Sequence, residues 1–130
     1  MATAGSKSRT ARQQDPCRTR EVLDIVGDKW SLLVVRNLSQ GPLRFTELKR
    51  AIDGISQRML TVTLRSLERD GILTRTVRNV MPPHVSYELT PMGKTLRQAT
   101  APLLEWSITH LAHIDAARAT YDARPDTSPT

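Results

Sequence analysis

With 130 residues the chain is long enough for one domain but not for two, and its 38% hydrophobic and 25% charged residues are typical of a soluble globular protein. It has no apolar run near the roughly 20 residues of a membrane-spanning helix, no signal-peptide-like stretch in residues 1–20 and one cysteine, so we expect a cytoplasmic protein with no intrachain disulfide and no membrane association. The net charge of +6 comes from residues 1–20 (five basic, one acidic) and 44–78 (eight basic, four acidic), and a basic block inside a folded domain favours a polyanionic partner, although a merely solvated surface has the same composition.

The two ends of the chain are predicted to lie outside the folded core. Residues 1–14 are rich in small and basic side chains without hydrophobic periodicity, which predicts a disordered basic arm. Residues 121–130, with Pro125 and Pro129 among small polar residues, are predicted to form a loose tail. The folded domain is therefore expected to span residues 15–120.

Two helices are predicted at the start of this domain. Asp15 followed by Pro16 is typical of an N-cap and a first helical position, and the helix that they begin is expected to end at Gly27. Asp28 is placed to cap a second helix, which Gly41-Pro42 ends. The apolar residues at helical spacing in these two segments are Val22, Leu23, Val26, Trp30, Leu33, Val34 and Leu38.

Residues 45–69 have the pattern of a helix-turn-helix. Phe45, Leu48 and Ile52 mark a helix of two turns. Residues 53–55 form a short turn whose glycine is free to adopt a positive φ, and Ser56 is placed to cap a longer helix that ends at Arg69. A short helix, a glycine-containing turn and a longer helix together make a helix-turn-helix.

The longer helix, residues 57–69, is the predicted recognition helix. At about 100° per residue, Leu60, Thr63, Leu64 and Leu67 fall on one side, which we expect to be buried. The other side carries three guanidinium groups and two hydrogen-bonding side chains, which suit guanine edges and phosphates in a major groove, although a solvated amphipathic helix has the same pattern. The predicted DNA-binding residues here are Ser56, Gln57, Arg58, Thr61, Arg65 and Arg69.

After Gly71 the hydrophobic period falls to two, which predicts strands over 73–77 and 85–89 around a connection containing Pro82-Pro83. A hairpin directly after a recognition helix can reach the neighbouring minor groove, where arginines bind narrow, electronegative segments. The predicted contacts of this hairpin are Arg75, Arg78, Asn79 and His84. Arg44, just before the helix-turn-helix, is a weaker candidate for a phosphate contact than Arg58 or Arg65.

A last helix is predicted from Thr90-Pro91 to Ile114, kinked or divided by Pro102. It carries two apolar stripes, more than one helix needs to dock on a domain of this size, so one face is expected to meet a partner. Association of two copies about a two-fold axis is the commonest solution. The predicted dimer-interface residues are Leu103, Leu104, Trp106, Ile108 and Leu111.

Several segments between residues 17 and 112 together resemble the HxlR-type family of bacterial transcription regulators. They are Cys17, VLDIVGDKW (22–30), GPLRF (41–45), GISQRML (54–60), LRSLERDG (64–71), VSYELT (85–90) and Trp106. The resemblance implies a mostly α-helical fold with a small β-hairpin, a winged helix-turn-helix related in shape to the MarR regulators, which dimerises through its terminal helices. It also implies a homodimer that binds double-stranded DNA at an inverted-repeat operator. Asp28 departs from the pattern, because a second glycine is expected beside Gly27.

Cys17 is a candidate redox sensor. Capping by Asp15 would place it near a helix N-terminus, where unpaired amides, the helix dipole and the charges of Arg18 and Arg20 favour a thiolate. Some members of the family that the chain resembles sense oxidants or electrophiles with a cysteine at the matching position, which implies an electrophile or another small molecule as effector. The alternative is a small residue packed at the dimer interface, since free cysteine is commonly buried.

Other functions are less well supported by the sequence. His110 and His113 lie one helical turn apart and could bind a metal with a third ligand such as Cys17, but this spacing alone is more often ordinary surface, so no metal and no cofactor are expected. No phosphate-binding glycine loop, nucleophile elbow or placed carboxylate pair is present, so the chain is not expected to be an enzyme. The remaining alternative is a winged-helix protein-interaction module that uses the same basic face on an acidic protein.

Overall fold

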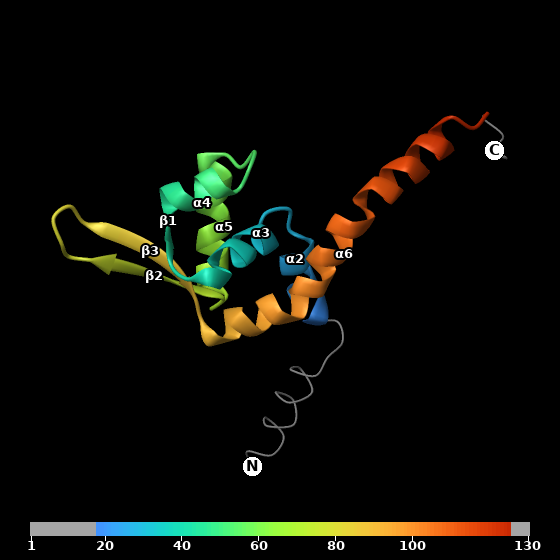
Figure 1. Ribbon diagram of the computed structural model, residues 1–130. Helices are drawn as coiled ribbons and strands as arrows, with labels where there is room; N and C mark the ends of the chain where they lie inside the picture. Colours follow the sequence, from blue (N-terminus) through green and yellow to red (C-terminus); the bar gives the residue numbers. More distant parts are fainter. Residues whose placement is uncertain (1–17, 126–130) are drawn as a thin grey trace, which may run out of the picture.

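The computed structural model describes residues 18–125. Its elements are α2 (Thr19–Gly27), α3 (Ser31–Asn37), the 3₁₀-helix η2 (Leu38–Gln40), β1 (Leu43–Arg44), α4 (Phe45–Ala51), α5 (Gln57–Arg69), β2 (Leu73–Arg78), β3 (His84–Leu89) and α6 (Pro91–Asp122). Helices α3, α4 and α5 form a central body from which the β2–β3 hairpin projects, and α6 crosses that body before it runs away from it (Figure 1). The predicted basic arm, the Asp15-Pro16 cap and Cys17 lie outside the described residues.

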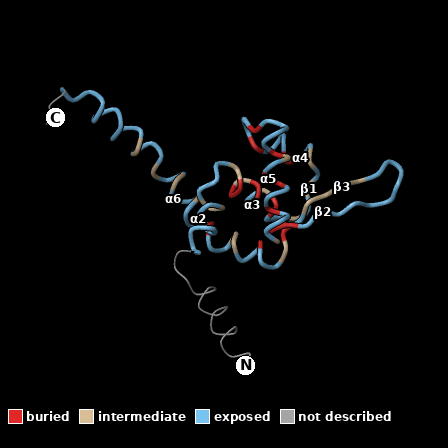
Figure 2. Tube along the Cα trace, turned by 180° about the vertical axis from the view of Figure 1, so that it is seen from behind, coloured by how far each residue is buried: buried red, intermediate tan, exposed pale blue. Residues whose placement is uncertain are grey.

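The core lies between α3, α4, α5 and the base of the sheet. The residues of this buried cluster are Val34, Val35, Leu38, Leu48, Ile52, Ile55, Leu60, Leu64, Leu67, Ile72, Leu73 and Leu89. Figure 2 shows that the buried residues gather in this central body, at the base of the hairpin and in the first part of α6, whereas most of β2 and α6 is exposed and residues 84–87 of β3 are half-buried. In α5 the buried residues are Leu60, Thr63, Leu64 and Leu67, the four that the helical period predicts.

The side chain of Asp28 caps the amides at the start of α3, whose first helical residue is Ser31. The Asp28 Oδ2 atom accepts hydrogen bonds from the backbone amides of Trp30 (3.1 Å) and Ser31 (2.9 Å) and from the Ser31 hydroxyl (2.7 Å). The φ of Asp28 is −67°, so the backbone at this position does not require glycine. The departure from the family pattern therefore costs no backbone strain, and it supplies a carboxylate that satisfies amides which a glycine would leave open.

The helix-turn-helix consists of α4, the turn at residues 53–55 and α5. Gly54 has a φ of 83°, which a side chain would disfavour. The Ser56 hydroxyl accepts a hydrogen bond from the Met59 amide at 3.1 Å, so it caps α5 as predicted. These two local features fix the angle at which α5 leaves the turn.

The sheet has three antiparallel strands in the order β1-β3-β2. The two strands of the hairpin are those that the sequence predicts, and β1 is an addition. Leu43 in β1 and Arg75 in β2 both lie opposite Tyr87 of β3, and Arg78 lies opposite His84. Because directly opposite residues share a face of the sheet, this register decides which hairpin residues point toward α5.

Helix α6 is continuous over its 32 residues, with Pro102 inside it. Figure 1 shows that the helix changes direction part-way along its length. We attribute this bend to Pro102, which lacks the amide hydrogen that would bond one turn back. The sequence left open whether this proline kinks or divides the helix, and the structure has the kinked, undivided form.

The start of α6 is tied to the end of α5. Thr90 Oγ1 accepts a hydrogen bond from the Gly93 amide (3.0 Å) and donates one to the Gly71 carbonyl (2.6 Å), while the Thr90 amide bonds to the Ile72 carbonyl (3.0 Å). Gly93 is buried, and a Cβ built on it would lie 2.0 Å from the Ile72 carbonyl oxygen. Only a residue without a side chain allows α6 to approach the Gly71–Ile72 turn this closely.

Candidate DNA-binding surface

The outer face of α5 is exposed and basic. Gln57, Arg58, Arg65 and Arg69 are exposed, and Thr61 is half-buried with its hydroxyl donating to the Gln57 carbonyl at 2.9 Å. Within residues 18–125, the one ion pair closer than 4.0 Å joins Arg18 and Glu21. The three guanidinium groups of α5 therefore have no carboxylate of the described chain within that distance, which leaves their charge available to an anion.

A groove of about 450 Å³ lies between α5 and the sheet. Its lining residues come from α4, α5, β2 and β3; they are Phe45, Thr61, Leu64, Arg65, Glu68, Arg75 and Tyr87. Two of them are arginines that line it from different elements, and one is a carboxylate on the same edge of α5 as Thr61. This groove would hold a negatively charged group better than a neutral one.

The other flank of α5 has the opposite charge. A hollow of about 220 Å³ separates it from α2, and the carboxylates of Glu21, Asp24, Asp28 and Asp70 line it. A hydrogen bond from Arg18 Nε (2.7 Å), followed by the charge of Arg18, holds the pKa of Glu21 below its ordinary value, so that carboxylate stays ionised near neutral pH. A polyanion is thus repelled from the α2 side of α5 and attracted to the hairpin side.

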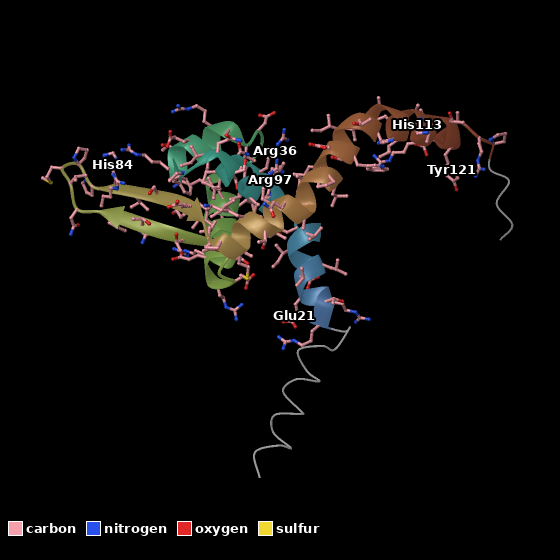
Figure 3. All side chains as sticks on the ribbon, turned by 60° about the horizontal axis from the view of Figure 1, so that its bottom comes forward. Glu21, Arg36, His84, Arg97, His113 and Tyr121 are labelled. Carbon is pink, nitrogen blue, oxygen red and sulfur yellow. The ribbon has the colours of Figure 1, made fainter. Side chains whose placement is uncertain are left out.

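The predicted hairpin residues lie on two faces of the sheet. Arg75 shares the face of Leu73 and Leu89, which points toward α5. Arg44, Arg78 and His84 share the opposite face by the strand register, and Asn79 is exposed in the connection between the strands. In Figure 3, His84 lies on the hairpin well away from Glu21 on α2.

Arg44 and His84 meet although 40 residues separate them. The distance from Arg44 Nη2 to His84 Nε2 is 2.7 Å, and because a guanidinium can only donate, the histidine nitrogen accepts. The Arg44 amide in turn donates to Glu47 Oε1 at 2.9 Å, which fixes the backbone at the start of α4. The two side chains predicted separately as a phosphate contact and a hairpin contact therefore form one exposed unit.

The predicted dimer residues lie on the second half of α6, where few other parts of the described chain reach. Trp106, Ile108 and Leu111 are exposed by 53%, 63% and 55%, Leu103 is also exposed and Leu104 is half-buried. The Trp106 ring stacks on the His110 ring with 4.6 Å between the centroids. His113 and Tyr121, labelled in Figure 3, mark the part of the helix that extends beyond the body.

Two further features concern metals and membranes. His110 Nδ1 lies 2.8 Å from the Trp106 carbonyl, and residues 18–125 hold no group of three or more histidine, cysteine or acidic side chains placed to bind a metal ion. Cys17, the suggested third ligand, lies outside the described residues. No helix in residues 18–125 combines the length and the apolarity needed to cross a membrane.

Sequence reasoning missed the groove and two of its lining residues, Glu68 and Tyr87. The sequence contains one signal of this groove. Leu73, Arg75 and Val77 share one face of the predicted strand, so an arginine occupies a position on its apolar face. The arrangement of α4, α5 and the hairpin defines a winged helix-turn-helix, a fold of transcription regulators.

Comparison with known proteins places the chain within that class. The model of the HxlR-like helix-turn-helix family matches residues 25–115, and the chain belongs to this family. The helix-turn-helix transcriptional regulator YtfH of Escherichia coli strain K12 is 40% identical over 104 residues, which cover 80% of this chain and 82% of that protein.

Solved structures agree with this assignment. The transcriptional regulator ytfH from Salmonella typhimurium is 39% identical with a TM-score of 0.71, and the alignment covers 82% of this chain and 94% of that one. The redox regulator HypR in its reduced form is 36% identical with a TM-score of 0.70, with coverage of 76% and 98%. The family and these relatives are transcription regulators and not enzymes, as the sequence predicts.

Proposed function

We propose that the protein is a cytoplasmic regulator that binds a specific sequence of double-stranded DNA as a homodimer. The observation that carries this proposal is the exposed face of α5, on which three arginines without a carboxylate partner in residues 18–125 follow a helix-turn-helix turn. The acidic hollow on the α2 side and the basic groove on the hairpin side orient a polyanion over this face. Membership of a helix-turn-helix regulator family supports the same surface.

In this proposal the N-terminal turn of α5 enters the major groove. The first residues of a recognition helix contact base edges, so Arg58 contacts a base and Gln57 contributes hydrogen bonds. The hairpin reaches the neighbouring minor groove through Arg78, Asn79 and His84. Arg44, which contacts His84, binds a phosphate beside it.

The homodimer is supported by the second half of α6. In proteins a helix is stabilised mainly by packing of its apolar face, and the exposed Trp106, Ile108 and Leu111 find no cover within residues 18–125. A second copy of the same helix offers the same apolar stripe, which an association about a two-fold axis can bury. Two recognition helices related by that axis bind an inverted repeat whose half-sites lie about one or two helical turns apart.

The proposed signal is oxidation or alkylation of Cys17. The similar protein HypR is a redox regulator, which supports this role. With one cysteine per chain, the product is a disulfide to the partner's Cys17, a mixed disulfide with a small thiol, or an alkylated thiol. DNA affinity is measured before and after diamide treatment in the wild type and in Cys17→Ser. An unchanged wild-type affinity, with mass spectrometry showing that Cys17 has reacted, leaves Cys17 as a packing residue.

DNA binding is tested by gel shift and footprinting with the DNA upstream of the protein's own gene. We expect a palindromic footprint, and Arg58→Ala should weaken binding by about 1 to 3 kcal/mol and relax the preference at one base pair in each half-site. A footprint from a monomer on a single half-site contradicts the dimer. If no DNA is bound and the same α5 variants abolish binding to an acidic protein, the chain is a protein-interaction module.

A further inference from the structure

The groove between α5 and the sheet contains an arginine where the fold predicts an apolar residue. Arg75 lies between Leu73 and Val77 on the same face of β2, and directly opposite Tyr87. Leu73 is buried in the core, whereas Arg75 is exposed, one pleat farther along the strand. The face of the sheet that packs in the core therefore carries a cationic residue just outside the core, and this residue, Arg75, lies across the groove from α5.

Arg65 and Glu68 form the opposing wall. They lie one helical turn apart on α5, and Leu64 and Phe45 help to line the groove beside them. Arg65 is eight residues from the start of the helix at Gln57, which is roughly 12 Å along its axis at 1.5 Å per residue. Because the N-terminal residues of a recognition helix contact the base edges, Arg65 and Glu68, more than two turns farther along α5, are placed toward the sugar–phosphate backbone in the proposed complex.

On the basis of the DNA binding proposed above, we propose that this groove binds one backbone phosphate of the operator and that Glu68 limits its affinity. The DNA strand whose backbone runs from the major groove under α5 to the minor groove under the hairpin crosses the groove between α5 and the sheet. Arg65 and Arg75 bind its phosphate from the two walls, and the Glu68 carboxylate opposes the same charge. Arg65 is then a phosphate ligand, and base contact falls to Arg58 at the N-terminal turn.

Glu68 affects affinity and leaves selectivity unchanged. A carboxylate that faces a phosphate lowers affinity for every DNA sequence by the same factor, because every sequence has the same backbone. Contacts between Arg58 and a base are unaffected by it, so the ratio of specific to nonspecific binding stays the same while both become weaker. Glu68 therefore raises the fraction of the regulator that is free of any DNA, operator and bulk DNA alike.

The test uses the full-length protein and compares charge-matched variants. Arg65→Gln and Arg75→Gln each remove one positive charge, with Arg36→Gln on α3 as the control outside the groove. Glu68→Gln removes one negative charge, with Asp122→Asn at the end of α6 as its control. Affinity is measured for the operator and for a panel of single base-pair variants at several salt concentrations.

We expect Arg65→Gln and Arg75→Gln each to weaken binding about fivefold on every sequence, and the double variant to lower the salt slope by about one, because the two arginines share one phosphate. The double variant should lose less than the product of the two losses, because both arginines bind one phosphate. Glu68→Gln should bind about threefold more tightly on every sequence, a gain that a folding defect cannot produce. One methylphosphonate linkage in each half-site should abolish the effect of all three substitutions.

Three results would overturn the proposal. If Arg75→Gln and Glu68→Gln match their controls while the wild type binds its operator, the groove holds no phosphate and the proposed function stands. If Arg65→Gln changes the preference at one base pair, Arg65 is a base contact. If the wild type binds no DNA, the proposed function fails as well.

Discussion

Replacement of Gly93 by alanine tests how closely α6 packs on the central body. The added Cβ would lie 2.0 Å from the Ile72 carbonyl oxygen and 3.3 Å from Leu89 Cδ2, so backbone must move. Crowding of this kind costs up to about 3 kcal/mol, and weakening of the Thr90 cap adds about 1 kcal/mol. The higher helix propensity of alanine offsets about 1 kcal/mol, which leaves a destabilisation of about 3 kcal/mol.

The assay is urea and thermal unfolding followed by circular dichroism at one fixed protein concentration, because the proposed dimerisation would make stability depend on concentration. For a chain of this size the thermal midpoint should fall by roughly 12 °C. Gly27→Ala is the matched control. Gly27 is also a helical residue, the last of α2, but a Cβ there meets nothing within 4 Å. That variant should range from unchanged to about 1 kcal/mol more stable. Equal stability of the two variants would refute the packing argument.

Three further predictions concern hydrogen bonds at helix starts. Thr90→Ala should lower the free energy of unfolding by about 1 to 2 kcal/mol. Thr90→Ser keeps the hydroxyl that bonds to Gly93 and Gly71, so its free energy of unfolding should stay within about 0.5 kcal/mol of the wild type. Equal losses in the two variants would mean that the methyl group of Thr90, and not its hydroxyl, stabilises the fold. Asp28→Ala should cost about 1 to 2 kcal/mol in urea unfolding, because three hydrogen bonds at the start of α3 are lost, and Asp28→Asn should recover most of it. The pKa of Glu21 lies below its ordinary 4.5, so its pairing with Arg18 stabilises the fold above that pH, and this stabilisation is lost as the pH falls through the lowered pKa. In an NMR titration, Arg18→Gln should raise the pKa of Glu21. An unchanged pKa would exclude Arg18 as the cause of the shift.

Local features of the fold were predictable from sequence because they depend on short-range physics. The buried side of α5 follows from helical period alone, and the caps Asp28, Ser56 and Thr90 follow from side chains that bond to amides two or three residues away. The strands of the hairpin follow from a change of period after Gly71. None of these needs knowledge of a distant part of the chain.

The features that sequence did not predict depend on contacts between distant segments. β1 has two residues, too few for a period, and exists because Leu43 and Arg44 pair with β3 more than 40 residues later. The separation of Arg75 from Arg78 onto two faces follows from the register of β2, which the sequence shows as alternation but does not orient toward α5. The role of Gly93 depends on Ile72, a neighbour only in space.

The hydrogen bonds of Thr90 to the Gly71–Ile72 turn make α6 a lever with its fulcrum beside the recognition helix. The helix is 32 residues long, or roughly 48 Å at 1.5 Å per residue, and its N-terminal end is fixed to the turn that ends α5. A displacement of roughly 4 Å at the far end corresponds to a tilt of about 5° of the whole helix, which the fixed end passes on to α5. The bend at Pro102 separates an inner arm of this lever, which moves with the central body, from an outer arm that extends beyond it.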